Sequence, residues 1–186
     1  MIEELKNSKV IAAIKGEDSL TEAINSDATM VFILRGSIMT VRQMVERIHK
    51  AGKKVYIHMD LIDGFGKDQA AIEFMSAEIK PDGILSTRNN IIKFAKDFGI
   101  STIFRVFLVD SQSLETAINN VEKLQPDAME IMPGVAYEAI RAVVSRTDTQ
   151  VIAGGFVRTE QNVRDALSAG AVACSTSVFQ LWSAKI

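Results

Sequence analysis

The stretch 149–177, TQVIAGGFVRTEQNVRDALSAGAVACSTS, contains one full repeat of the pattern that decides the fold. Its two apolar runs, Thr149–Ala153 and Ala171–Ser175, are too short and too apolar for exposed helices and are typical of buried strands. Between them, Thr159 is placed to cap a helix with one apolar face, and Gly170 is placed to end it. The stretch therefore predicts a strand, a helix and a second strand.

Six further apolar runs of the same kind precede this stretch, and their starts recur roughly every 20 to 30 residues. These runs are Lys9–Ile14, Thr29–Leu34, Lys53–Met59, Asp82–Ser86, Ser101–Leu108 and Asp127–Met132. Amphipathic segments separate the runs, as in 114–124, where apolar residues recur at helical spacing. The whole chain therefore alternates between strands and helices.

Eight strand–helix units in a row predict a parallel sheet with helices outside it. Closure into a compact (β/α)8 TIM barrel is favoured, because a closed ring of eight strands has no edge to protect. An open doubly wound sheet is the competing architecture, but the first turn, residues 15–18 (KGED), is not a dinucleotide-binding glycine motif. Since no proline-rich or low-complexity linker interrupts the alternation, we expect residues 1–186 to form one domain.

Composition limits the class of protein. A hydrophobic share of 47% with 24% charged residues excludes disorder, and a net charge of −2 gives no general attraction for nucleic acid or an anionic membrane. The lone cysteine, Cys174, lies in an apolar run, which is typical of a buried thiol in a reducing compartment. Neither a signal peptide nor an apolar run of about 20 residues is present, so we expect a cytoplasmic protein without membrane contact.

Charged side chains near the ends of several strands are predicted to face the barrel mouth. His58 and Asp60 alternate with apolar neighbours, and the same alternation turns Arg105 and Glu130 inward. Inward charges are costly unless they are paired or bind a ligand. One interpretation is a structural ion-pair network. The other is a polar cup for a small ligand with hydroxyl groups, in which Asp60 and Glu130 accept and Arg105 donates. His58 alone is equally consistent with a buried structural histidine.

The ends of the last two strands predict a phosphate site. Gly154 and Gly155 would let backbone N–H groups approach an anion, and Ser175, Thr176 and Ser177 supply hydroxyl donors. These two loops are the usual phosphate position in this fold. The alternative is that the glycines form only a tight turn and the Ser-Thr-Ser segment only a helix cap.

The sequence predicts no catalytic residues, cofactor or metal. Lys15 is the only candidate for a Schiff-base lysine at a strand end, and the third strand ends in residues 60–63 (DLID), which lack the lysine of an orotidine-phosphate-type decarboxylase. The two histidines, His49 and His58, are too few for a catalytic metal centre. An acid–base pair of Asp60 and Glu130 leaves an isomerase or lyase acting on a small phosphorylated metabolite as the alternative function.

Several motifs together resemble one known family. They are HMDLIDG (58–64), DGILST (82–87), RVFLVDS (105–111), EIMPG (130–134), IAGGFVRT (152–159), and STS (175–177) followed by Leu181 and Trp182. The chain resembles the glycerol uptake operon antiterminator family over nearly its whole length. Arg88 stands where a lysine is expected, which keeps the charge.

The resemblance implies a regulator of glycerol metabolism that senses glycerol 3-phosphate and binds the leader mRNA of glycerol uptake genes, so that transcription passes a terminator. Basic residues are candidates for the RNA surface, either around 42–54 or scattered among Arg141, Arg146, Arg158 and Arg164. No RNA-binding sequence motif is present. A homodimer would join two weak basic patches. A metabolite-binding protein that does not bind RNA is a further alternative.

Overall fold

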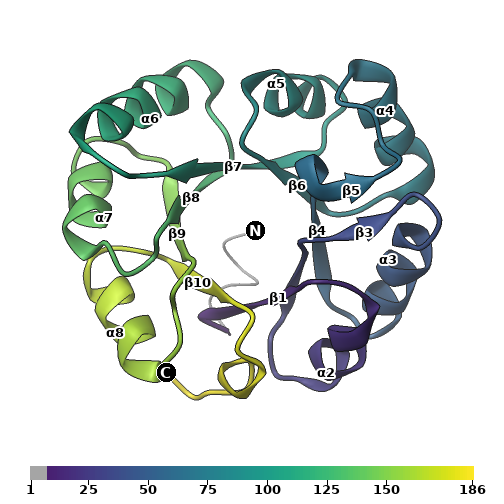
Figure 1. The fold of residues 1–186 in the computed structure, drawn as a ribbon, viewed down its shortest axis with the longest axis horizontal. Coiled ribbons are helices and arrows are strands. Elements are labelled where there is room, and N and C mark those ends of the chain that lie inside the picture. The colour runs from purple at the N-terminus through teal and green to yellow at the C-terminus, as the bar shows by residue number, and fades with distance from the viewer. Residues whose placement is uncertain (1–7) are drawn as a thin grey trace.

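The computed structural model describes residues 8–186 as a ring of eight parallel strands surrounded by helices (Figure 1). The barrel closes in the order β1-β10-β9-β8-β7-β6-β4-β2. Its strands are β1 (Val10–Ile14), β2 (Met30–Ile33), β4 (Lys54–His58), β6 (Gly83–Ser86), β7 (Ser101–Phe107), β8 (Ala128–Met132), β9 (Gln150–Gly154) and β10 (Ala173–Thr176). The sequence-predicted TIM barrel is confirmed, and each predicted strand agrees with an observed one to within two residues at either end.

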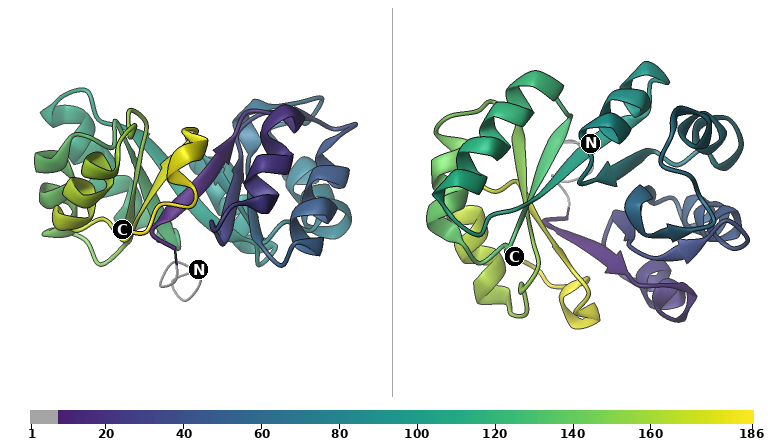
Figure 2. Two further views of the ribbon diagram at one scale, coloured as in Figure 1. Left: turned by 90° about the horizontal axis from the view of Figure 1, so that it is seen from below. Right: turned by 45° about the horizontal axis from the view of Figure 1, so that its top comes forward.

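The helices lie outside the ring and connect the carboxyl end of one strand to the next (Figure 2). They are α2 (Leu20–Asn25), α3 (Val41–Lys50), α4 (Gln69–Phe74), α5 (Asn89–Asp97), α6 (Ser111–Leu124), α7 (Tyr137–Val144) and α8 (Glu160–Ser168). The predicted cap is confirmed at Thr159, whose hydroxyl accepts a hydrogen bond from Asn162 N while the Asn162 side chain accepts one in return from Thr159 N.

Two local features differ from the regular repeat. Only a 3₁₀ turn, Phe179–Leu181, follows β10, although the sequence predicts a helical unit there. Trp182 ends this turn buried, and its Nε1 donates to Thr176 O at 2.8 Å. A small two-stranded sheet of β3 (Gly36–Ser37) and β5 (Ile62–Asp63) also forms beyond the ends of β2 and β4, and two-residue strands carry too little pattern to be predicted.

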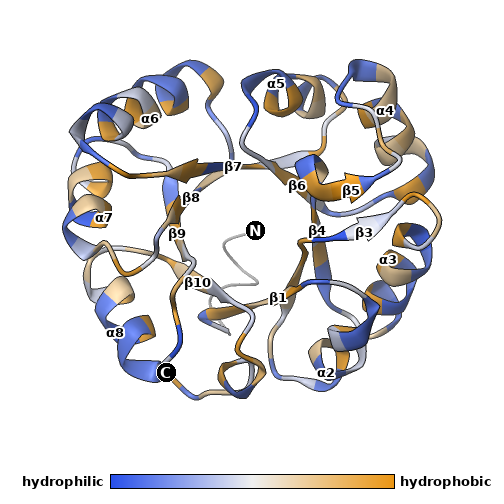
Figure 3. Ribbon diagram, in the orientation of Figure 1, coloured by the Kyte–Doolittle hydropathy of each residue, from blue (hydrophilic) through white to orange (hydrophobic). Residues whose placement is uncertain are grey.

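Apolar side chains form two layers, one inside the ring of strands and one between the strands and the helices. Figure 3 shows that the strands are largely apolar and that the surrounding helices are polar on their outer faces. The alternation in β4 is as the sequence predicts: Val55 and Ile57 pack outward against the helices, and Tyr56 packs inward. Tyr56 and Gly83 are register partners across β4 and β6, and the tyrosine ring occupies the space that a side chain at 83 would need. Away from the mouth, apolar side chains and Tyr56 therefore fill the interior of the barrel. The charged inward side chains are confined to the mouth.

Residues 1–7, which include the segment that the sequence analysis found unlike a signal peptide, lie outside the described part of the chain. Among residues 8–186, every helix is too short or too polar to cross a bilayer. Cys174 is buried in the outer layer, and burial raises the pKa of its thiol to about 12, which keeps it protonated at neutral pH.

The packing around Gly83 predicts a stability change. In Gly83→Ala the new Cβ would lie 2.1 Å from Tyr56 Cε1 and 2.7 Å from Ser101 O, so we expect a loss of about 1–3 kcal/mol in the free energy of unfolding, measured with urea. Gly36→Ala is the matched control, because its Cβ would meet neighbours only at ordinary contact distances of 3.7–3.9 Å. Equal stability of the two variants would contradict this account of the inner layer.

Candidate functional site

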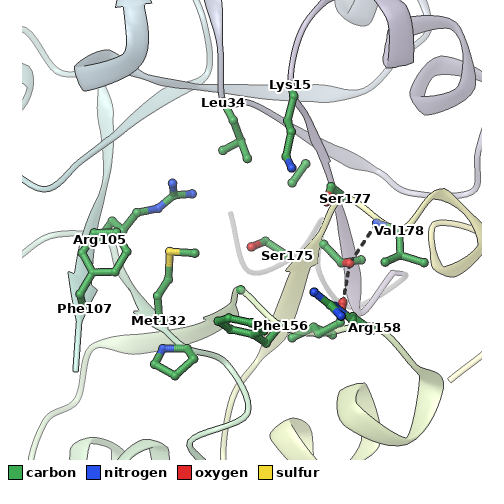
Figure 4. Close-up of a pocket in the computed structure, with 15 residues that line it drawn as sticks. Lys15, Leu34, Arg105, Phe107, Met132, Phe156, Arg158, Ser175, Ser177 and Val178 are labelled. Carbon is green, nitrogen blue, oxygen red and sulfur yellow. Dashed lines mark hydrogen bonds between the residues drawn. The ribbon is translucent and has the colours of Figure 1, made fainter. Parts of the chain in front are cut away.

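A pocket of about 390 Å³ opens at the carboxyl ends of the strands, between β1, β7, β8 and the loops that follow β9 and β10 (Figure 4). Both loops of the sequence-predicted phosphate site contribute residues to the walls of this pocket. Of the predicted residues, Gly155, Ser175, Thr176, Ser177 and Arg105 line this pocket. Gly154, Glu130, His58 and Asp60 are not among its lining residues.

A buried ion pair forms the floor of the pocket. Arg105 and Glu130 are register partners across β7 and β8, and Arg105 Nε donates to Glu130 Oε2 at 2.5 Å. The other carboxylate oxygen, Oε1, accepts a hydrogen bond from Ser175 Oγ. Glu130 is 0% exposed and Arg105 5% exposed, so both charges are taken out of water and stabilise each other. Both Glu130 oxygens are therefore engaged by the protein itself.

Arg105 has hydrogen-bonding capacity left over. Its Nε is used by Glu130, and no further partner for the guanidinium occurs among residues 8–186. Figure 4 shows the terminal amino groups of Arg105 pointing into the pocket, with the Lys15 amine reaching in from another side. Glu130 thus fixes the orientation of a cation whose free donors face the cavity.

The two glycines after β9 have different tasks. A Cβ on Gly154 would lie 2.4 Å from Glu130 Oε1 and 2.8 Å from Ser175 Oγ, so this glycine leaves space for the buried network. Gly155 lines the pocket and has a φ of 75°, in the region that favours glycine. Gly134 N donates to Gly154 O at 2.5 Å, which holds the segment after β8 against the glycine pair.

The segment after β10 is fixed by Thr176. Its hydroxyl donates to Val157 O at 2.7 Å and accepts from Val178 N at 3.1 Å, which ties the last loop to the loop after β9. Ser177 is exposed in the pocket wall, and its hydroxyl has no hydrogen-bond partner within residues 8–186. Of the three hydroxyls in the Ser-Thr-Ser segment, only that of Ser177 is free to donate to a ligand.

The charged residues that line the pocket are all basic. Lys15, Arg105 and Arg158 line it, and no Asp or Glu stands among the residues that do. Neither Lys15 nor Arg158 is paired with a carboxylate in the described chain, and the Arg158 guanidinium carbon lies 5.7 Å from the centre of the Phe156 ring. Sequence reasoning considered Lys15 only as a Schiff-base lysine and Arg158 only as a scattered surface residue. The position of Lys15 directly after β1, next to β10 in the closed ring, is the signal that places it here.

His58 and Asp60 belong to a separate cluster, at the ends of β4 and β6. Asp60 accepts from Ser86 Oγ at 3.0 Å and from Thr87 N at 2.8 Å, and Arg88 Nε lies 3.2 Å from its Oδ1. His58 Nδ1 is 3.7 Å from Asp60 Oδ2, too far for a hydrogen bond, and it is buried without a hydrogen-bond partner among residues 8–186. Asp60 therefore organises the loop after β6.

Burial and the neighbouring Arg105 charge lower the pKa of His58 to about 4, and the Asp60 carboxylate only partly opposes this shift. His58 is neutral at physiological pH. The structure thus divides the sequence-predicted polar cup: Arg105 lines the pocket with Lys15 and Arg158, whereas Asp60 and His58 belong to a charge-compensated cluster at the ends of β4 and β6.

A model of the glycerol-3-phosphate responsive antiterminator family matches residues 10–182 of this chain. The chain belongs to this family. Two crystal structures resemble this antiterminator closely. One, titled glycerol uptake operon antiterminator regulatory protein, from Listeria monocytogenes, has a TM-score of 0.88 at 33% identity over 92% of each chain. The other, titled a glycerol uptake operon antiterminator-related protein, from Thermotoga maritima, has a TM-score of 0.83 at 32% identity, covering 93% of this chain and 96% of that one.

The antiterminator also has a relative in Escherichia coli K12, the uncharacterized protein YgcP, which is 36% identical over 179 residues, 96% of this chain and 94% of that one. More distant likenesses concern the fold alone. Deoxyribose phosphate aldolase from Aeropyrum pernix has a TM-score of 0.69 at 14% identity, over 98% of this chain and 90% of that one. These similarities show the same barrel in enzymes, but they assign no chemistry to the residues of this antiterminator.

The buried His58 predicts a pH dependence of the free energy of unfolding. Because its folded-state pKa is about 4 and the ordinary value is 6.5, the unfolded chain takes up a proton that the folded chain excludes, and stability should fall as pH drops from about 6.5 to about 4. His58→Gln should remove this loss, which amounts to at most about 3 kcal/mol, in urea unfolding at pH 7, 6 and 5. A wild-type slope in His58→Gln would refute the assignment.

Proposed function

We propose that this antiterminator binds glycerol 3-phosphate in the cationic pocket, and that the bound form acts in the cytoplasm on the leader mRNA of glycerol uptake genes. The observation that carries the proposal is a pocket with three cations and no carboxylate, at the strand ends of a chain whose family is described as responsive to this ligand. A cavity of about 390 Å³ lies at the small end of the usual range for ligand sites, which suits a three-carbon phosphate.

In this proposal the phosphate lies between the loops after β9 and β10. Gly155 allows close approach of the backbone, Ser177 offers a free hydroxyl donor, and Lys15 supplies a positive charge. Gly154, Ser175 and Thr176 support this site by packing and by holding the two loops together. Desolvation of the pocket strengthens these charge-assisted contacts.

The glycerol end of the ligand then extends towards Arg105, whose free amino groups donate to its hydroxyls. Glu130 contributes by fixing Arg105. Asp60 and His58 are not expected to contact the ligand, because the Asp60 oxygens are used by the loop after β6 and neither residue lines the pocket. This assignment revises the sequence-based cup, in which Asp60 and Glu130 accept directly from the ligand.

The role we propose is binding without turnover. The lining residues include one amine, Lys15, and neither a histidine nor a carboxylate that would serve as its acid–base partner. The Asp60–Glu130 pair considered from the sequence does not serve either, because Glu130 is buried with both oxygens engaged.

Thermal unfolding with increasing glycerol 3-phosphate tests the effector. The melting temperature should rise with ligand concentration by mass action, and glycerol or inorganic phosphate should give smaller shifts. Ser177→Glu places a negative charge in the anion site and should remove the shift. Ser168→Glu, on the exposed end of α8, should keep it. An equal shift in both variants would exclude the phosphate position, and no shift at millimolar ligand in the wild type would exclude the effector.

Filter binding tests the RNA. Transcripts of the leader regions upstream of glycerol uptake genes in the organism that encodes this chain should be retained more strongly with glycerol 3-phosphate than without it. A scrambled transcript of equal length is the control, since charge alone should retain it weakly whether or not ligand is present. Retention of leader and scrambled RNA to the same degree would rule out a leader-specific antiterminator, whatever the result of the ligand titration.

A further inference from the structure

Two phenylalanines stand exposed at the mouth of the cationic pocket. Phe107, at the end of β7, is 56% exposed, and Phe156, in the loop after β9, is 67% exposed. Both line the pocket, so their rings border the opening rather than a distant surface. Large apolar rings at the edge of a cationic opening are unexplained by the binding of a small polar effector.

From these features we infer that single-stranded RNA binds across the mouth of the pocket itself, with bases stacked on Phe107 and Phe156 and backbone phosphates on Lys15, Arg35 and Arg158. The inference rests on the proposed function and adds to it the location and the form of the RNA. It places effector and RNA on the same rim of the barrel.

The conformation of Phe156 supports a stacking role. Its φ is 60°, a left-handed value that is rare and costly for a bulky side chain and that persists where the surrounding structure holds it. Arg158 packs its guanidinium 5.7 Å from the centre of the Phe156 ring. An aromatic ring beside an arginine is the combination on which unpaired bases stack in single-strand binding sites, whereas bases of a duplex are not available for stacking.

The distribution of ion pairs removes most other candidate surfaces. The basic residues that the sequence offered for RNA are largely neutralised by carboxylates: Arg42 by Glu78, Lys54 by Asp82, Arg141 by Glu138, Arg146 by Glu115 and Arg164 by Glu160. Lys53 donates to the backbone oxygens of Ser26 and Ala28. Arg47, Lys50 and Arg158 have no carboxylate partner within residues 8–186, and of these three only Arg158 lines the pocket.

Lys15 and Arg35 extend the cationic edge around the mouth. Lys15 follows β1, Arg35 comes directly after the pocket residue Leu34, and neither is paired with a carboxylate within residues 8–186. The N-termini of α6, α7 and α8 face the same rim, so their partial positive charges add to the field. Glu17 and Asp18 follow Lys15 closely in the chain, and their carboxylates repel phosphates. We therefore expect the RNA strand to run from β1 towards β7 and away from α2.

Shared residues give the inference a regulatory consequence. The loop 155–158 supplies Gly155 and Val157 to the pocket wall and Phe156 and Arg158 to the edge. A ligand that fixes this loop also fixes the stacking surface, and RNA lying over the mouth obstructs release of the ligand. The factor by which the ligand tightens RNA binding must then equal the factor by which RNA tightens ligand binding.

The test uses the full chain and RNA selected on it from a random pool of 30-nucleotide single strands, in the presence of saturating glycerol 3-phosphate. Affinity for the selected RNA is then measured at saturating ligand for Phe107→Ala and Phe156→Asn, the latter chosen because asparagine tolerates a positive φ. Both should bind about tenfold more weakly than the wild type or worse. Phe74→Ala, at an exposed ring of α4 outside the pocket, should stay within twofold.

The salt dependence provides a second readout. Arg158→Gln should reduce the slope of log affinity against log salt by about 0.7, the change expected for one lost phosphate contact on a single strand. Arg146→Gln, whose arginine is paired with Glu115, should leave the slope unchanged. Calorimetry with glycerol 3-phosphate alone, on every variant, establishes folding and effector binding separately.

The outcomes are distinct. One outcome is that the wild type binds the effector and the selected RNA while Phe107→Ala, Phe156→Asn and Arg158→Gln bind RNA like the wild type. In that case the inferred location of the RNA is wrong and the proposed function stands. If the effector does not bind, or no RNA is enriched, the proposed function itself fails. If sedimentation shows that the phenylalanines join two copies of the chain while RNA binding is unaffected, the rim is a dimer interface and the inference is overturned.

Discussion

The ion pair between Arg105 and Glu130 is the constraint around which the mouth of this barrel is arranged. A carboxylate with no solvent exposure is tolerated only because Arg105 and Ser175 saturate it on both sides. The pair forms directly across the β7–β8 register, and Ser175 reaches it from β10 over Gly154, its register partner on β9. Four neighbouring strands thus converge on one buried charge, and the lack of a side chain at 154 is what makes room for it.

This arrangement explains the uneven distribution of charge around the rim. Glu130 compensates the charge of Arg105 but is not among the residues that line the cavity, so the charged residues that do line it are all cations. On the opposite side, Asp60 is compensated by Arg88 and by donors of the loop after β6. A chain with a net charge of −2 can therefore carry a locally cationic pocket, because the field at a site depends on nearby unpaired groups more than on the total charge.

The sequence predicted the barrel, because the alternation of short apolar runs with amphipathic segments is a local signal that recurs along the whole chain. It also turned Arg105 and Glu130 inward, since alternation along a strand is equally local. It did not predict which partners these residues find. That Asp60 is used by Thr87 and Arg88, or that Gly154 packs while Gly155 lines the pocket, depends on register and loop geometry between segments far apart in the chain. Arg158 shows the same limit: nothing near it in the sequence distinguishes it from Arg146, and only the fold leaves one paired and the other at the pocket.

The same barrel serves as a scaffold for aldolases, and a comparison of architecture alone would favour an enzyme. The difference between an aldolase and the binding role proposed here lies in whether the polar groups at the mouth are already engaged by the protein. Catalysis by proton transfer needs a titratable group that reaches the ligand and is free to change its charge. Here Glu130 and Asp60 are held by several donors, and His58 is buried with its pKa lowered to about 4. The charged side chains that line the cavity, Lys15, Arg105 and Arg158, are all basic. Such a mouth supports the binding without turnover that we propose for this chain.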